Sequence, residues 1–259
     1  MDPLLIAGLI VLAGVAELID SAIGMMYGTM LSPLLIILGF DPLVTVPALV
    51  FSQAVGGLVA AIRHHKYGHA DFNLHTPDFK AFLIIVVPGL IAVAIGAFLA
   101  ISIDKQLLKY YISFLVLVIG LLVLLDIKFR YSWKKMGAIG FVSSFNKALS
   151  GGGFGPFVTG GQIVIGRGSK NSIGITTFAE VPICFGAFAA YFLLKGFTDW
   201  PFLVSLSVGA LIGGLLGPKV TNLAYEGKLK RIVGLVTFLL GVVLVLNIAG
   251  ILKVGGLGA

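Results

Sequence analysis

Four ionisable side chains lie within long apolar runs or at their inner ends. They are Glu17, Asp20, Lys147 and Glu180. A charged side chain at the centre of a membrane helix costs roughly 2.5–3.5 kcal/mol, so each of them is a candidate functional group. Lys147 follows Asp20 by 127 residues. Its ammonium could attract a bound anion, or it could pair with Asp20 or Glu17 as a structural contact, and the sequence leaves both interpretations open.

Two glycine-rich junctions accompany these charges. Residues 146–156 read Asn-Lys-Ala-Leu-Ser-Gly-Gly-Gly-Phe-Gly-Pro, and residues 20–28 read Asp-Ser-Ala-Ile-Gly-Met-Met-Tyr-Gly. Glycine lets backbone N–H groups approach a ligand closely. A helix that begins directly after such a junction points its free N–H groups and the positive end of its dipole at one place, which favours an anion. The alternative is that the glycines only allow close packing between helices, which we expect for isolated glycines such as Gly56 and Gly213.

The junctions predict a binding site for a small anion. Its expected residues are Ser21, Gly24, Asn146, Lys147, Ser150, Gly151, Gly152 and Gly153. Glu180 lies near the centre of an apolar segment, and Gln53 precedes it by 127 residues. Because a low-dielectric site favours the neutral form of a carboxyl group, we expect Glu180 to be the proton-coupling residue. A structural carboxyl held by hydrogen bonds is the alternative, or a buried ion pair, for which Lys147 is the first partner to test.

The histidines and the cysteine give no metal site. His64, His65, His69 and His75 fall in what we expect to be one basic loop after the third apolar segment. Their spacing matches no standard metal site, although pH sensing would suit the residue type. The lone Cys184 excludes an internal disulfide and a cysteine-rich zinc site. The sequence therefore predicts neither a bound metal nor a cofactor.

The composition requires a membrane. Of the 259 residues 58% are hydrophobic and only 11% are charged, and the mean hydropathy is +1.08. A soluble domain carries roughly 25% charged residues, so too little polar surface remains for a water-soluble protein. The net charge of +7 does not imply nucleic acid, because the basic residues lie in short gaps between apolar runs. We expect a multi-pass protein of the inner (cytoplasmic) membrane, whose first apolar run is retained rather than cleaved.

Ten apolar segments are long enough to cross or deeply enter a bilayer, and they lack the polar–apolar alternation of barrel strands. They predict an all-α membrane protein with one transmembrane transport domain over residues 1–259. The expected segments are 3–19, 24–39, 43–62, 80–101, 107–125, 133–148, 152–166, 172–194, 200–218 and 231–250. The short segments 24–39 and 152–166 are expected to form re-entrant hairpins with their predecessors.

Residues 3–125 and 131–250 are predicted to be internal repeats. Gly24 and Gly28 recur 127 residues later as Gly151 and Gly155. Each repeat holds five segments, so the second must enter the membrane from the opposite face, an arrangement typical of secondary transporters that bind substrate near the midplane. Alternate connections carry 13 of the 18 lysines and arginines. The positive-inside rule places those connections in the cytoplasm and both termini outside.

The second junction also carries a family resemblance. Its motif Ser150-Gly151-Gly152-Gly153-Phe154-Gly155-Pro156, the degenerate copy at residues 24–29, and the later Gly120 and Gly241 resemble the TauE/SafE sulfite-exporter family over essentially the whole chain. The first copy departs from the pattern because Met25-Met26 replace glycines. The resemblance implies an all-helical carrier for sulfite, sulfonate-related or other small anions.

We therefore expect a secondary transporter, not an enzyme, that exports sulfite, a sulfonate or a related sulfur oxyanion. A membrane potential of about 100 mV, negative inside, is worth about 2.3 kcal/mol per elementary charge, so a dianion leaves without a coupled ion. Two alternatives remain: an anion channel of the same architecture, and an intramembrane hydrolase with Ser150 as nucleophile and Lys147 as base. The expected partners are the small anion and the lipid bilayer, with no nucleic acid; a homo-oligomer is left open.

Overall fold

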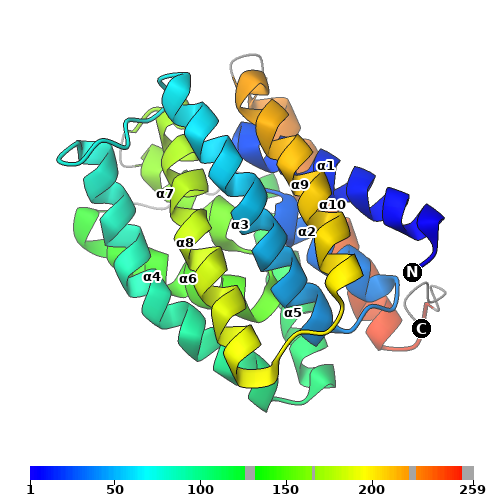
Figure 1. Ribbon diagram of the computed structural model, residues 1–259. Helices are drawn as coiled ribbons and strands as arrows, with labels where there is room; N and C mark the ends of the chain where they lie inside the picture. Colours follow the sequence, from blue (N-terminus) through cyan, green and yellow to red (C-terminus); the bar gives the residue numbers. More distant parts are fainter. Residues whose placement is uncertain (126–131, 165–166, 222–225, 253–259) are drawn as a thin grey trace.

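The computed structural model of the chain describes residues 1–125, 132–164, 167–221 and 226–252. Within these ranges it is all-helical, with ten α-helices (Figure 1). They are α1 (Pro3–Ile23), α2 (Tyr27–Ile37), α3 (Pro42–Lys66), α4 (Pro77–Ser102), α5 (Lys105–Leu124), α6 (Trp133–Ser150), α7 (Phe154–Val164), α8 (Ser169–Lys195), α9 (Trp200–Val220) and α10 (Glu226–Ile248). The predicted all-α class and the ten segments are confirmed. The basic residues Lys128, Arg130 and Lys253 and the end of segment 152–166 lie outside the described residues.

Several helices begin at an N-cap side chain that the sequence places directly before proline. Asp2, Asp41 and Thr76 each accept a hydrogen bond from a backbone N–H of the first turn. The proline that follows each cap has no N–H to leave unpaired and already has a helical φ angle. These local signals fix where α1, α3 and α4 start, within three residues of the boundaries predicted by hydropathy.

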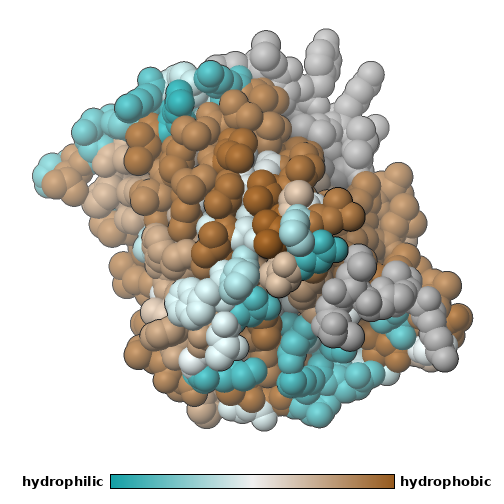
Figure 2. All heavy atoms as spheres, turned by 45° about the vertical axis from the view of Figure 1, so that its right-hand side comes forward, coloured by the Kyte–Doolittle hydropathy of each residue, from teal (hydrophilic) through white to brown (hydrophobic). Residues whose placement is uncertain are grey.

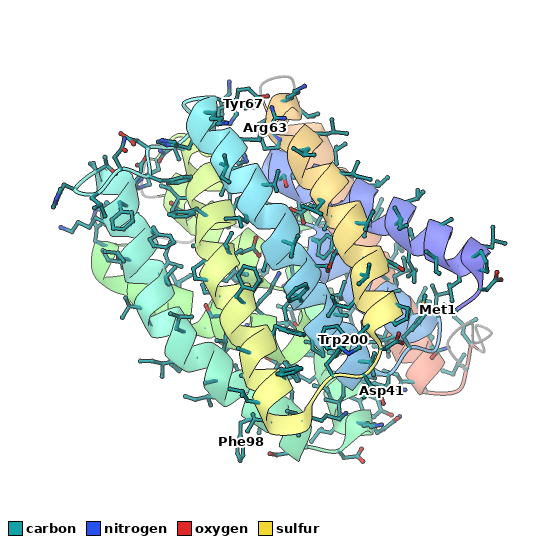
Figure 3. The ribbon with its side chains drawn as sticks, viewed as in Figure 1. Met1, Asp41, Arg63, Tyr67, Phe98 and Trp200 are labelled. Atoms are coloured by element: carbon teal, nitrogen blue, oxygen red, sulfur yellow. The ribbon has the colours of Figure 1, made fainter. Side chains whose placement is uncertain are left out.

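Helix length separates the spans from the short helices. Among the described residues, six helices are long and apolar enough to cross a membrane, namely α1, α3, α4, α5, α8 and α9. In contrast, α2 and α7 have 11 residues each, about half of what a crossing requires. Met1 and Asp41 lie at the same end of the bundle, opposite Arg63 and Tyr67 (Figure 3). The chain thus enters through α1 and returns through α2 before α3 crosses.

The helices pack in a definite order. α3 and α8 lie against each other at the centre of the bundle, α9 packs on α3 and α1, α4 packs on α8 and α6, and α5 pairs with α10. Glycines bring some backbones very close, because a Cβ on Gly213 or Gly214 would overlap a carbonyl oxygen of Gly14 or Gly56. The predicted packing role of Gly56 and Gly213 is confirmed, and it is the usual role of small residues between membrane helices.

The outer surface matches a bilayer. Large apolar side chains stand exposed on several helices, including Leu193 at 82%, Phe98 at 60% and Val87 at 59%. The face drawn in Figure 2 is broadly hydrophobic, with hydrophilic residues gathered toward the upper edge and the lower end. Exposed apolar area of this extent marks contact with lipid. The end of the bundle that carries Arg63, Lys66, Lys80, Arg167 and Lys170 is called the basic end below.

Candidate substrate site

Two backbone breaks interrupt the hairpins α1–α2 and α6–α7. Gly24 and Gly151 end α1 and α6 with φ angles of 76° and 75°, and Gly153 follows with a φ of 86°. This left-handed conformation is the common way for a helix to end, and glycine adopts it without a Cβ penalty. The glycines that the sequence singled out therefore stop one helix so that another can start.

The two breaks contact each other directly. A Cβ on Gly28 would overlap the carbonyl oxygen of Gly151, and a Cβ on Gly155 would overlap that of Gly24. A Cβ on Gly152 would lie 2.8 Å from the Cα of Thr29. We call this contact between residues 24–29 and 151–155 the glycine crossing. At Gly28, Gly152 and Gly155 the space beside the backbone is filled by the other hairpin, so close packing is one reason for these glycines.

Beside the crossing, four helices contribute one side chain each to a buried charge network formed by Asp20, Gln53, Lys147 and Glu180. The Lys147 ammonium donates to Glu180 Oε1 at 3.1 Å and to Gln53 Oε1. The Gln53 amide nitrogen donates to Glu180 Oε2 and Asp20 Oδ2, both at 3.2 Å. None of the four is more than 4% exposed. The lysine is thus paired, and the pairing joins the two halves of the chain.

Asp20 also caps α2, the short helix of the first half. Its Oδ1 accepts a hydrogen bond of 2.9 Å from the backbone N–H of Tyr27, the first residue of α2. A carboxylate here is stabilised by the free N–H groups and the dipole of the helix start. The helix start that was expected to attract an anion therefore already binds one, supplied by the chain itself. The Tyr27 hydroxyl is held in turn by Ser52 Oγ at 2.7 Å.

A third carboxyl group lies next to the network. Glu17 is 1% exposed, and its Oε1 accepts a hydrogen bond of 2.9 Å from Ser21 Oγ. Its Oε2 is buried and has no hydrogen-bond partner among the described residues. Three carboxyl groups and one ammonium thus share this buried region. Uncompensated charge is very costly away from water, so bound protons or a bound cation must balance the excess.

The other predicted site residues are held by neighbours outside the network. Ser150 Oγ donates to the carbonyl of Asn146 at 2.7 Å and accepts from the N–H of Gly152 at 3.2 Å. The Asn146 side chain accepts from the Tyr111 hydroxyl on α5. Neither Ser150 contact is with Lys147, whose ammonium is occupied by Gln53 and Glu180. This geometry offers the hydrolase alternative no base for Ser150.

Sequence reasoning missed the role of Gln53 and misplaced two histidines. The signal for Gln53 was present, because it precedes Glu180 by 127 residues and the two side chains meet where α3 packs on α8. The expectation of a loop for all four histidines was wrong for His64 and His65, because α3 continues to Lys66, and His64 is fully buried. His69 lies in the loop but is only 7% exposed.

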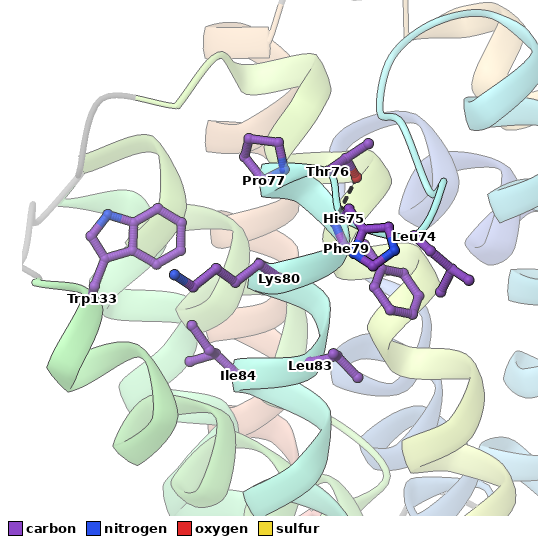
Figure 4. A pocket seen from close by; sticks show the side chains of 9 residues that line it. All are labelled: Leu74, His75, Thr76, Pro77, Phe79, Lys80, Leu83, Ile84 and Trp133. Carbon is purple, nitrogen blue, oxygen red and sulfur yellow. Dashed lines mark hydrogen bonds between the residues drawn. The ribbon is translucent and has the colours of Figure 1, made fainter.

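A separate cavity of about 800 Å³ opens at the basic end, between the starts of α4 and α6. Figure 4 shows Lys80 extending across it toward Trp133, with Leu83 and Ile84 below. None of the predicted site residues lines it. Its lining is mainly apolar, and it lies where helix ends meet the membrane surface. It therefore lacks the convergent polar groups that a small anion requires.

Comparison with known proteins decides the family. Residues 9–244 match the family described as sulfite exporter TauE/SafE, which is most of the chain. The chain belongs to the TauE/SafE family. The resemblance seen in the glycine motif is thereby confirmed, and the chain is assigned to a family of membrane transporters rather than to an enzyme family.

Two curated relatives come from Bacillus subtilis. The "Probable membrane transporter protein YtnM" is 27% identical over 213 residues, which is 76% of this chain and 68% of that protein. The "Probable membrane transporter protein YdhB" is 25% identical over 206 residues, or 74% of this chain and 80% of that protein. No solved structure gives a significant match. Neither name specifies a substrate.

Proposed function

We propose that this protein is a secondary transporter that exports a small sulfur oxyanion, sulfite or a sulfonate, across the cytoplasmic membrane. The observation that carries the proposal is the buried ammonium of Lys147 beside the glycine crossing, 2% exposed. A lysine at this depth is costly even when it is paired, and such residues commonly mark substrate or ion pathways. The family description as sulfite exporter supports an oxyanion as that charge.

The proposed architecture is a pair of inverted repeats within one transport domain. If α1–α5 and α6–α10 are equivalent in order, the contact of α1 with α9 corresponds to that of α6 with α4. The contact of α3 with α9 corresponds in the same way to that of α8 with α4. All four pairs of helices pack against each other. The crossing is reciprocal in the same way: Gly28 meets Gly151, and its equivalent Gly155 meets Gly24. Gln53 and Glu180, at equivalent positions, bond to each other, as expected for residues beside a pseudo-two-fold axis.

The proposed substrate site is the region between Lys147 and the crossing, lined by Ser21, Gly24, Asn146, Ser150, Gly151, Gly152 and Gly153. In the described arrangement Glu180 neutralises Lys147 at 3.1 Å. An incoming anion must compete with Glu180 for the ammonium, because Lys147 interacts more strongly with whichever anion is nearer. Once displaced, the Glu180 carboxylate has lost its counter-ion and takes up a proton. Glu180 is thus the proposed proton-coupling residue.

The proposed orientation places the basic end in the cytoplasm and both termini outside. It rests on the positive-inside distribution of lysine and arginine. For a dianion, a potential of about 100 mV then contributes about 4.6 kcal/mol toward exit, because each elementary charge is worth about 2.3 kcal/mol. The proposed partners are the small anion and the lipid bilayer; a homo-oligomer stays a prediction.

Transport by the purified full-length protein in liposomes tests the function. Labelled sulfite, an organosulfonate and sulfate are compared, each with and without a pH gradient and against empty liposomes. We expect saturable movement of sulfite or the sulfonate that depends on the pH gradient, because the anion site is single and proton-linked. Flux that never saturates would indicate a channel, and the absence of any anion flux would refute the proposal.

Glu180→Gln is expected to remove the pH dependence of anion binding. In the wild type, lower pH protonates Glu180 and releases Lys147, so anion affinity should rise as the pH falls. The variant cannot ionise, so its affinity should be high and constant with pH, measured by isothermal titration with sulfite. Asp71→Asn, an exposed acid in the loop after α3, is the control and should keep the wild-type profile. A wild-type profile in Glu180→Gln would leave this carboxyl a structural role.

A further inference from the structure

Glu17 differs from the two other buried carboxyl groups in how few partners it has. Asp20 accepts from Tyr27 N–H and from Gln53, and Glu180 accepts from Lys147 and from Gln53. Glu17 accepts one hydrogen bond, from the hydroxyl of Ser21, and its Oε2 has none among the described residues. A buried carboxylate with one neutral donor is poorly compensated, whereas a carboxylic acid in the same place is tolerated.

Charge balance points to the same residue. The titratable groups that face Glu17 are Asp20 on its own helix and, from neighbouring helices, Tyr27, Lys147, Glu180 and Cys184. α9, which packs along α1, places Gly213 against Glu17 and brings no charge there. Lys147 pairs with Glu180, and Asp20 is compensated by the start of α2. No cation is left for Glu17 among the described residues, so a proton is the simplest way to neutralise it.

A chain of hydrogen bonds connects Glu17 to the basic end. Ser21 Oγ is 2.9 Å from Glu17 Oε1, and the Ser21 carbonyl oxygen is 2.9 Å from His64 Nε2. His64 Nδ1 is 2.8 Å from His69 Nδ1. His69 lines a polar cavity of about 410 Å³ at the basic end, together with His65, Asp71, Asn73, Asp78 and Asn171. The chain therefore runs from a buried carboxyl group to a water-accessible depression.

We propose that Glu17 is a second proton-binding site of the transporter, filled from the basic end through His69, His64 and Ser21. This proposal adds a proton site to the proposed function, and it does not depend on which anion is carried. It also assigns a role to the two buried histidines, which the substrate site does not use. The proton enters as hydronium or from a buffer in the cavity and ends as the acid hydrogen of Glu17.

The contacts fix the protonation of both rings before transfer. A carbonyl oxygen only accepts, so His64 Nε2 carries hydrogen, and in the neutral ring Nδ1 must then accept from His69 Nδ1–H. A proton from the cavity first binds His69 Nε2, and the resulting imidazolium gives its Nδ1 proton to His64 Nδ1. His64 then passes its Nε2 proton to Ser21 Oγ as the ring shifts from the carbonyl to the hydroxyl of the same residue, and Ser21 gives its own proton to the Glu17 carboxylate. Both rings end neutral with the hydrogen on the other nitrogen, and rotation of each ring restores the starting hydrogen bonds.

Infrared difference spectroscopy of the full-length protein in liposomes tests the site without any transported anion. The carbonyl stretch of a protonated carboxyl group shifts when its proton exchanges for deuterium, so both occupancy and exchange rate are measured. We expect a protonated-carboxyl band at neutral pH that Glu17→Gln removes. Glu180→Gln should leave it unchanged, because Glu180 is ionised while it pairs with Lys147.

The path is tested by the rate at which that band exchanges after a jump into deuterated buffer. His64→Gln and His69→Gln should each slow the exchange by about tenfold or more, as removal of a positioned proton carrier does. His75→Gln changes an exposed histidine of the same segment that does not line this cavity, and it should leave the rate unaltered. Since His64 also caps the end of α1, its variant could fold poorly; the His69 variant keeps that cap and decides alone.

Three outcomes would overturn the proposal. One is a protonated-carboxyl band that survives Glu17→Gln. Another is an exchange rate that neither histidine variant changes. The third is a band that appears only when sodium is removed, which would assign the balancing charge to a metal cation. None of these outcomes requires sulfite, so a chain that carries no sulfur oxyanion could still satisfy this test, and the two proposals fail separately.

Discussion

Gly28→Val is expected to prevent stable folding, the largest effect of any single change at the site. The new side chain would occupy the position of the Gly151 carbonyl oxygen, and that atom belongs to a backbone held between two helices. Because a backbone cannot turn aside as a flexible side chain can, we expect a loss of about 3 kcal/mol or more in the free energy of unfolding. Thermal unfolding in detergent, followed by intrinsic fluorescence, measures it.

Gly160→Val is the matched control for this change. Gly160 also lies in a short helix, α7, but a Cβ there meets nothing within 4 Å. The variant carries the same β-branched side chain, so it corrects for the propensity of valine in a helix. Gly155→Val, at the reciprocal contact with Gly24, should reproduce the effect of Gly28→Val. Equal melting temperatures for the Gly28 and Gly160 variants would show that the two breaks do not touch.

Lys147→Met is expected to destabilise the protein by about 3–5 kcal/mol, the usual cost of removing one partner from a buried ion pair. The change leaves three buried carboxyl groups without a cation, and the Gln53 side-chain oxygen without its donor. Methionine keeps most of the volume, so the loss reports charge rather than packing. The same variant should lose most of its affinity for sulfite at every pH.

A double variant separates the ion pair from the rest of the effect. Lys147→Met with Glu180→Gln removes both charges, so part of the lost stability should return. Lys195→Met, at the exposed end of α8, is the control and should change the stability by less than about 0.5 kcal/mol. Unfolding free energies for the four combinations give the coupling. Additive losses would mean that Lys147 and Glu180 do not interact as described.

The helices could be predicted from the sequence because hydropathy alone defines them. The predicted segments match the observed helices to within a few residues, since the caps at Asp2, Asp41 and Thr76 only adjust the ends. The burial of the charged residues could also be predicted, because an ionisable residue inside an apolar helix avoids lipid by facing the interior of the bundle. Their depth follows from position along the helix, which the sequence gives directly.

The partners of those charges could not be predicted in the same way. The sequence offered Asp20 or Glu17 as structural partners of Lys147, and Lys147 as the first partner to test for Glu180. In the structure the ammonium binds Glu180 and Gln53. Which helices pack together decides this, and hydropathy does not encode it. The 127-residue spacing did point to Gln53 and Glu180, because in the proposed inverted repeat these residues occupy equivalent positions on α3 and α8, which pack together. That inference needed the knowledge that α3 packs on α8.

The glycines were similarly ambiguous. A glycine beside a helix start leaves space next to the backbone, but the sequence does not show whether a ligand or another part of the protein occupies that space. At Gly28 and Gly152 the other hairpin fills it. At the proposed site an anion would therefore have to approach from the side of Lys147 rather than along these two residues. His64 was misassigned for a different reason: a basic, histidine-rich stretch is polar by composition, although one ring of it caps the buried end of α1.

The glycine crossing could also serve as a pivot point between the two halves of the protein. Both hairpins meet there mainly through backbone atoms, and Thr159 Oγ1 of α7 donates to the Gly24 carbonyl at 3.2 Å, so the contact itself can stay in place during a small rotation of one half against the other. A rotation about this point moves the two ends of each helix in opposite directions. Tilting one half by a few degrees would therefore widen the bundle at the basic end while narrowing it at the other, with the contact between Gly28 and Gly151 left in place.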